Sequence, residues 1–170
     1  MKIRKADIKD AELLVELGSK TFYDTYHEQN TVDDMEQYLS ANFTIQHIKE
    51  EILDPSNDFY VAEKKEEVTG YIKISESATP KEISHLKSLE IAKIYTVKNV
   101  HGKGVGTLLL HKAFEIAKQR EKDAVWLCVW QKNDKAIRFY KKHGFVIIAK
   151  ANFVLGTDVQ DDWIMAKYFD

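Results

Sequence analysis

The stretch LEIAKIYTVKNVHGKGVGTLLL, residues 89–110, decides the fold of this chain. Its first part, residues 89–97, mixes apolar and β-branched side chains and therefore predicts a strand. Residues 99–103 have the composition of a turn, and from Gly104 onward apolar residues recur at helical spacing. The stretch thus predicts a strand, a glycine loop and a helix in direct succession.

The glycine loop is a candidate anion site. The N–H groups of a first helical turn have no partner within the helix, and the helix dipole adds positive potential there. Because glycine lets a phosphate approach the backbone closely, residues 102–107 predict a phosphorylated ligand. A plain strand-to-helix turn is the alternative interpretation of the same glycines.

Two common phosphate-binding motifs do not match the spacing of HGKGVG, residues 101–106. No second glycine is followed by Lys and Ser or Thr, as a nucleoside-triphosphate loop requires. The GxGxxG step of a dinucleotide site is also missing, and residues 126–130 hold no acidic side chain for a ribose. The loop therefore favours another phosphorylated ligand.

The composition fits one globular domain, which we expect to span residues 1–170. The 25 Lys and Arg residues against 27 Asp and Glu give a formal net charge of -2. Without an excess of basic residues, we expect neither nucleic acid nor membrane as a partner. The single Cys128 and a start without the apolar core of a signal peptide predict a cytoplasmic protein.

Patterning along the rest of the chain predicts a mixed sheet with helices on both faces. The predicted strands are residues 1–5, 59–63, 68–75, 89–97, 124–129, 145–155 and 162–167, with a charged turn at 64–67 and another turn at 156–158. The predicted helices run from Asp7 as a cap to about Tyr26, from Thr31 through Leu39, over 45–53, from Gly104 onward, and from Asn133 to Gly144.

A second motif, N-x-x-A-x-x-F-Y-x-x-x-G-F at residues 133–145, follows the glycine loop and the next predicted strand. Together the two motifs resemble the GCN5-related N-acetyltransferases. The matching residues are His101, Gly104, Gly106, Asn133, Ala136, Phe139, Tyr140, Gly144 and Phe145. The first of these, His101, stands where the family usually has Gln or Arg. The segments TFYDTY (21–26), LEI (89–91) and IMAK (164–167) resemble the PaiA-type spermidine/spermine N-acetyltransferases.

The resemblance implies a mostly antiparallel α/β sheet that is splayed at its centre, and acetyl-CoA as the cofactor, without a metal. It places the pyrophosphate on the glycine loop and the pantetheine arm along the central strand. The implied cofactor-binding residues are Ile94, Tyr95, Thr96, Gly102, Lys103, Gly104, Val105, Gly106, Thr107, Asn133 and Tyr140. For Asn133, a helix N-cap is an alternative or additional role.

Acetyl transfer to an amine needs a neutral amine, whereas an alkyl ammonium has a pKa of about 10. Glu90, on the central strand, is the candidate base, and a surface or salt-bridged glutamate is the alternative. By resemblance, Tyr140 lies near the CoA sulfur as acid or hydrogen-bond donor, with core packing as the alternative. Cys128, within an apolar strand, is expected to be buried and inert.

The segment between the first two predicted helices combines carboxylates with aromatic rings, which suits a polycation. Glu28 is the best candidate for binding the acceptor ammonium, with Tyr26 beside it, whereas Asp34 is explained by helix capping. The histidines lack metal-ligand spacing, so no metal site is expected.

The predicted function is transfer of acetyl from acetyl-CoA to a primary amine, a polyamine above all, in a ternary complex. The alternatives are another small amine, a protein amine, or a CoA-binding regulatory domain with little turnover. The late strands could supply the edge of a homodimer.

Overall fold

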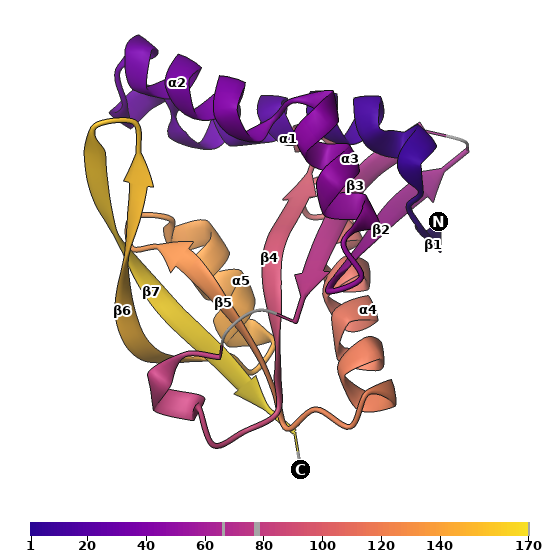
Figure 1. The fold of residues 1–170 in the computed structure, drawn as a ribbon. Helices are drawn as coiled ribbons and strands as arrows, with labels where there is room; N and C mark the ends of the chain where they lie inside the picture. Colours follow the sequence, from indigo (N-terminus) through magenta and orange to yellow (C-terminus); the bar gives the residue numbers. More distant parts are fainter. Residues whose placement is uncertain (66, 77–78, 170) are drawn as a thin grey trace.

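The computed structural model describes residues 1–65, 67–76 and 79–169, which form one seven-stranded sheet in the order β1-β2-β3-β4-β5-β7-β6 (Figure 1). All neighbouring strands are antiparallel except β4 and β5. This confirms the predicted mixed, mostly antiparallel sheet. The strands are β1 (Lys2–Lys5), β2 (Asn57–Lys64), β3 (Glu67–Ser75), β4 (Ser88–Thr96), β5 (Ala124–Trp130), β6 (Val146–Leu155) and β7 (Asp158–Tyr168).

Helices cover both faces of the sheet. One face packs on α1 (Ala11–Tyr26), α2 (Val32–Asn42) and α3 (Ile45–Leu53), and the other on α4 (Val105–Gln119) and α5 (Asp134–Lys142). Figure 1 shows α1 and α2 running across the upper end of the sheet, well above α4 and α5. No helix in the described part of the chain has the length and apolar content to cross a bilayer.

Most predicted boundaries lie within two residues of the observed ones, but α2 extends to Asn42 rather than Leu39, and β7 is longer than predicted. It begins at Asp158 rather than at residue 162, because the polar residues 158–161 continue the antiparallel pairing with β6 down to the turn. Asp7 caps a short 3-10 helix (Ile8–Asp10) instead of α1 itself. The predicted turn at 64–67 includes residue 66, which lies outside the described residues.

The centre of the sheet splits where β4 and β5 part. The two strands pair at only three positions, the last being Glu90 with Trp126, although β4 continues to Thr96 and β5 to Trp130. A β-bulge at Ala92 interrupts the pairing of β4 with β3 just past this point, and bulges bend a strand. We call this place, past Glu90 and Trp126, the split, and Figure 1 shows the two strands diverging there. The predicted splay is thus confirmed.

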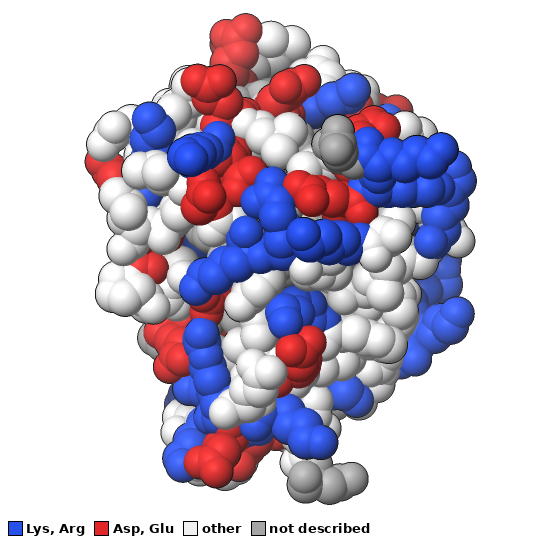
Figure 2. Space-filling model, turned by 90° about the vertical axis from the view of Figure 1, so that its right-hand side faces the viewer, with Lys and Arg blue, Asp and Glu red and all other residues white. Residues whose placement is uncertain are grey.

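Charged side chains are mixed over the surface that Figure 2 displays. Lys and Arg lie interspersed with Asp and Glu across this face, rather than gathering into one large patch of a single sign. Among the described residues, some charged side chains are paired, as Arg120 is with Asp58 and Glu76. The face in Figure 2 therefore does not itself indicate a surface for a highly charged partner.

Candidate active site

The glycine loop has an open backbone at the start of α4. Gly102 and Gly104 have φ angles of +78° and +84°, in the left-handed region that favours glycine. A Cβ atom on either residue would meet nothing within 4 Å, and no side chain caps the helix at Gly104. The N–H groups of the first turn of α4 therefore face an accessible space that fits a phosphate.

The sequence-predicted loop residue His101 links the loop to two neighbouring elements. Its Nε2 lies 3.2 Å from the carbonyl oxygen of Thr96, at the end of β4, and its Nδ1 lies 2.9 Å from Nζ of Lys135, on α5. The ring thereby brings the Lys135 ammonium beside the glycine loop, which adds positive charge where an anionic cofactor would bind.

The open edge of β4 lies next to this loop. Ile94, Tyr95 and Thr96, the predicted pantetheine-binding residues, come after the last pair with β5, so β5 does not use their backbone groups. Their side chains alternate, with Ile94 packed in the α4 core and Tyr95 against the α1 and α2 side. An unpaired strand edge of this kind can accept an extended ligand as an additional strand.

Tyr140 and Asn133 both belong to α5. Tyr140 is 7% exposed, burial raises the pKa of its hydroxyl, and that hydroxyl makes no hydrogen bond with any described residue. It therefore stays protonated and can donate to a ligand. The Asn133 side chain accepts a hydrogen bond from the N–H of Ala136 at 3.1 Å, so the alternative role of Asn133 as the N-cap of α5 is realised.

Glu90 and Cys128 lie on the sheet face that α1 and α2 cover. Glu90 is partly buried, beside the last pair of β4 and β5. Cys128 is exposed, so the expected burial of this residue is wrong. The physical reason is the split, since β5 has no β4 neighbour at this position. Desolvation by surrounding protein groups, followed by the charges of Asp162 and Glu90, raises the pKa of the thiol to about 11.

Aromatic rings gather on the same face, at the far end of β5. The ring of Tyr26 lies 5.4 Å from that of Trp130, and the ring of Tyr38 lies 5.4 Å from that of Phe153. Burial raises the pKa of Tyr38 to about 12 and also raises the pKa of Tyr26. Phe22, which stacks on Tyr38, completes this set, which we call the aromatic group: Phe22, Tyr26, Tyr38, Trp130 and Phe153.

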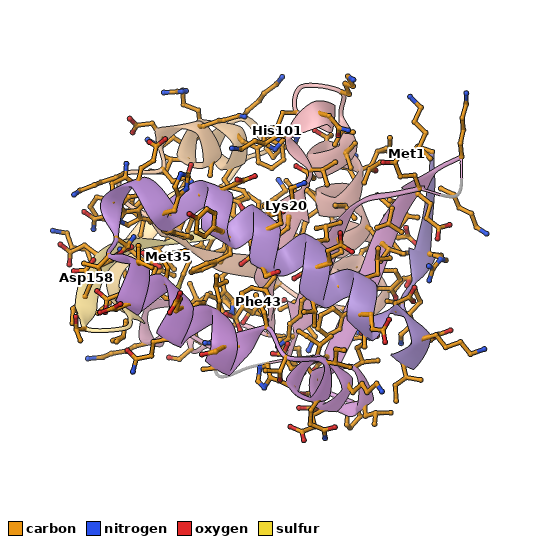
Figure 3. All side chains as sticks on the ribbon, turned by 90° about the horizontal axis from the view of Figure 1, so that it is seen from above. Met1, Lys20, Met35, Phe43, His101 and Asp158 are labelled. Carbon is orange, nitrogen blue, oxygen red and sulfur yellow. The ribbon has the colours of Figure 1, made fainter. Side chains whose placement is uncertain are left out.

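The acidic residues predicted for the acceptor side differ in their surroundings. Glu28 is exposed, on a short 3-10 helix (His27–Gln29) after α1. Asp24 pairs with Lys98 at 3.4 Å. Asp34 caps α2 with Thr31 and also accepts hydrogen bonds from Thr157 in the turn between β6 and β7. Met35 follows Asp34 in the sequence and Asp158 follows Thr157, and Figure 3 shows both at the same end of the molecule.

Sequence reasoning missed two polar residues on β7. Gln160 and Asp162 are 6% and 8% exposed, and they lie on the side of the sheet that carries Trp130 and Phe153. The available signal was the period of two along QDDW, residues 160–163, which places 160 and 162 on one face. The predicted strand began only at 162, so this alternation was not used. Among the described residues, no group of three or more His, Cys, Asp or Glu side chains could hold a metal.

A model of the acetyltransferase (GNAT) family matches residues 19–145. An uncharacterised N-acetyltransferase in the pepI 3′ region of Lactobacillus delbrueckii subsp. lactis is 31% identical over 167 residues, 98% of this chain and 96% of that protein. An uncharacterised N-acetyltransferase of Mycobacterium tuberculosis is 27% identical over 158 residues, 93% of this chain and 97% of that protein.

Among solved structures, PaiA N-acetyltransferase from Thermoplasma acidophilum in complex with coenzyme A superimposes with a TM-score of 0.81. It is 23% identical, and the match covers 99% of this chain and 98% of that one. At that identity the likeness establishes the fold, and the family model and the sequence relatives establish the membership. The chain belongs to the acetyltransferase (GNAT) family and is an N-acetyltransferase, an acyltransferase that uses acetyl-CoA.

Proposed function

We propose that this enzyme acetylates a primary amine of a polyamine such as spermidine or spermine, by direct attack in a ternary complex. The observation that carries the proposal is the split between β4 and β5. On one side it adjoins the open glycine loop, and on the other the sheet face with the aromatic group and buried carboxylate.

Two features next to the split support the proposed acetyl-CoA site. The start of α4 offers N–H groups to the pyrophosphate, and the open edge of β4 offers backbone groups to the pantetheine arm. The cofactor supplies the acetyl group as a thioester. The proposed binding residues are Ile94, Tyr95, Thr96, Gly102, Lys103, Gly104, Val105, Gly106, Thr107, Asn133 and Tyr140.

The chain's own groups then have three tasks. Glu90 accepts a proton from the acceptor ammonium, directly or through water, so that the nitrogen can attack the acetyl carbon. A backbone N–H of β4 polarises the thioester carbonyl. Tyr140, which burial keeps protonated, donates a hydrogen bond to the departing sulfur while the C–N bond forms and the C–S bond breaks.

We further propose that Tyr26 and Glu28 bind the acceptor. Tyr26 belongs to the aromatic group, whose rings suit a cation, and Glu28 is an exposed carboxylate just past it in sequence. Glu28 would meet an ammonium of the acceptor at the surface.

The proposal includes the domain extent, the compartment and the oligomeric state. We propose one domain over residues 1–170. We place the enzyme in the cytoplasm because a single exposed cysteine fits a reducing compartment. A homodimer through β6 is part of the proposal, since β6 lies at the sheet edge and exposes apolar Val146 and Val154.

The test is the release of free CoA from acetyl-CoA with spermidine, spermine, putrescine, aminoglycosides, amino acids and lysine peptides. Saturable turnover with the longer polyamines, weakened by Glu28→Gln, is the expected result. Asp33→Asn, which alters an exposed carboxylate on α2, is the matched control. Turnover only with peptides or another amine would reject the polyamine. Tight binding of acetyl-CoA without transfer to any acceptor would reject the catalytic function.

A further inference from the structure

Two buried acceptor oxygens on β7 have no hydrogen-bond partner among the described residues. They are Oε1 of Gln160 and Oδ1 of Asp162. The Nε2 of Gln160 donates to Oδ1 of Asn30 at 2.8 Å and to Oδ2 of Asp158 at 2.9 Å, which fixes the amide with its oxygen left over. Since buried polar groups normally find partners, two orphaned acceptors two positions apart on one strand face indicate a ligand that donates hydrogen bonds.

Asp162 also lacks a cation. No described Lys, Arg or His forms an ion pair with it, and the charge of the neighbouring Asp161 repels it. Burial, followed by that repulsion, raises the pKa of the Asp162 carboxyl to about 6, so it is mostly ionised at neutral pH. The other buried charges on this sheet face are already paired, with Glu51 holding both Lys73 and Lys93.

Aromatic residues lie on the same sheet face as the Asp162 carboxylate. Asp162 is the β7 partner of Trp130, and its charge contributes to the raised pKa values of Tyr26 and Tyr38. Phe153, the β6 partner of Gln160, closes the same side. A carboxylate and an amide oxygen among Trp, Tyr and Phe rings form a chemically specific site for an organic ammonium, whose N–H groups bind the oxygens and whose charge favours the ring faces.

The position along the sheet separates this site from the proposed base. Glu90 pairs with Trp126, whereas Asp162 pairs with Trp130, four positions farther along β5, roughly 13 Å at about 3.3 Å per residue. The attacking amine must be neutral, so a buried carboxyl that is mostly ionised at neutral pH is best matched by a nitrogen that stays charged. A long diamine or polyamine can place one nitrogen at Glu90 and another at Asp162.

We propose that Asp162 and Gln160 form the subsite for a second, non-reacting ammonium group of the acceptor. This inference rests on the proposed acetylation of an amine, and it restricts the acceptor to molecules with two amino groups separated by a long chain. Glu28, being exposed, lies outside this subsite.

The experiment compares two acceptors of equal chain length, 1,8-diaminooctane and 1-aminooctane, at saturating acetyl-CoA. The diamine has the chain length of spermidine, and the monoamine lacks only the second ammonium. In the wild type we expect kcat/KM to be about 10- to 100-fold higher for the diamine, the range of a hydrogen-bonded charge. In Asp162→Asn this preference should fall to about twofold or less, while the KM for acetyl-CoA stays unchanged.

Asp161→Asn is the matched control, because Asp161 is the adjacent carboxylate on β7 but is exposed. It should keep the preference for the diamine. If Asp162→Asn does not fold, the pair Asp162→Glu and Asp162→Gln, equal in size, separates charge from packing, and only Asp162→Glu should retain the preference. An unchanged preference in Asp162→Asn, or an equal loss for both acceptors, would overturn the inference.

A failure of the proposed function gives a different result. If the wild type acetylates no amine, calorimetric binding of 1,8-diaminooctane to the CoA-loaded protein decides the inference alone. Binding that Asp162→Asn abolishes and Asp161→Asn preserves would support it. No binding to the wild type would overturn it.

Discussion

Glu90 and Trp126 form the last pair between the only parallel neighbours in the described sheet, and past them β4 and β5 separate. The relationship places a carboxylate at the point where strand pairing ends. It also leaves the edge of β4 without a β5 partner and the side chain of Cys128 on β5 exposed. We expect the cofactor and the acceptor to meet at this point.

Replacing Tyr140 by Phe should slow turnover and spare cofactor binding. The hydroxyl is kept protonated by burial and makes no hydrogen bond with the described residues, so its loss removes a donor without breaking a structural contact. We expect kcat to fall by about 100-fold, the lower end of the range for a positioned proton donor. Calorimetry should find that CoA still binds, held by the glycine loop and the edge of β4. An unaltered kcat would exclude a role for this hydroxyl.

Gly104→Ala should weaken acetyl-CoA binding. The residue has a φ angle of +84°, which costs an L-residue about 1–2 kcal/mol, although the added Cβ meets no atom within 4 Å. The variant should fold with a slightly lower Tm and should show a raised KM for acetyl-CoA, because the loop backbone shifts at the anion site. A lowered Tm with an unchanged KM would mean that this loop does not bind the cofactor.

Asp34→Ala should weaken the contact of α2 with the turn between β6 and β7, on the proposed acceptor side of the sheet. Asp34 accepts hydrogen bonds from the N–H of Thr157 at 2.6 Å and from its hydroxyl at 3.0 Å, and so links α2 to the turn between β6 and β7. These elements carry Tyr38 and Phe153 of the aromatic group. We expect a lower Tm and a higher KM for the amine, with Asp33→Ala as the exposed control. Equal effects of the two variants would contradict this linkage.

The stabilisation of the folded state by the Asp34 carboxylate depends on pH in a definite direction. Hydrogen bonds from Thr157, its N–H first, lower the pKa of Asp34 below its ordinary value. The stabilisation is therefore present above the unfolded-state pKa of about 4 and is lost as the pH falls through the lower, folded-state pKa. The Tm difference between the wild type and Asp34→Ala should accordingly be constant from pH 6 to pH 8.

Asp162→Asn should stabilise the ligand-free protein, with the opposite pH dependence. Because the folded-state pKa of Asp162 is raised to about 6, its charge costs stability as the pH rises through this value. Removing the charge should increase the free energy of unfolding by about 2–3 kcal/mol at pH 8 and by less at pH 5, since each pKa unit corresponds to about 1.4 kcal/mol. Urea denaturation at both pH values measures this difference. The same gain at both would contradict the assignment.

Asp162→Asn should also lower the pKa of Cys128. After desolvation, the charge of Asp162 is the largest cause that raises the thiol pKa to about 11. The thiol is exposed, so the pH dependence of its alkylation rate by iodoacetamide reports this pKa directly. In the variant the rate should begin to rise at a lower pH. An unshifted profile would show that the two groups do not interact.

Much of the fold follows from local sequence. The helix predicted over residues 45–53 agrees with α3, since Pro55 prevents its continuation, and the structure adds Thr44 as its N-cap. The glycine loop was also predicted, since Gly102 and Gly104 occupy backbone conformations that other residues avoid. The start of β7 was not predicted, because its polar residues 158–161 form a strand only through their pairing with β6.

By itself, the sequence determined the order of strands and helices, the glycine loop and the family motif, since each depends on neighbours in the chain. Tertiary structure alone decided where β4 leaves β5, why Cys128 is exposed, and which buried carboxylate keeps an oxygen without a hydrogen-bond partner among the described residues. Burial and pairing are properties of residues distant in sequence. Among the described residues, Asp162 has no cation beside it because the neighbouring elements supply aromatic rings instead. The residues next to Asp162 in the sequence do not reveal this.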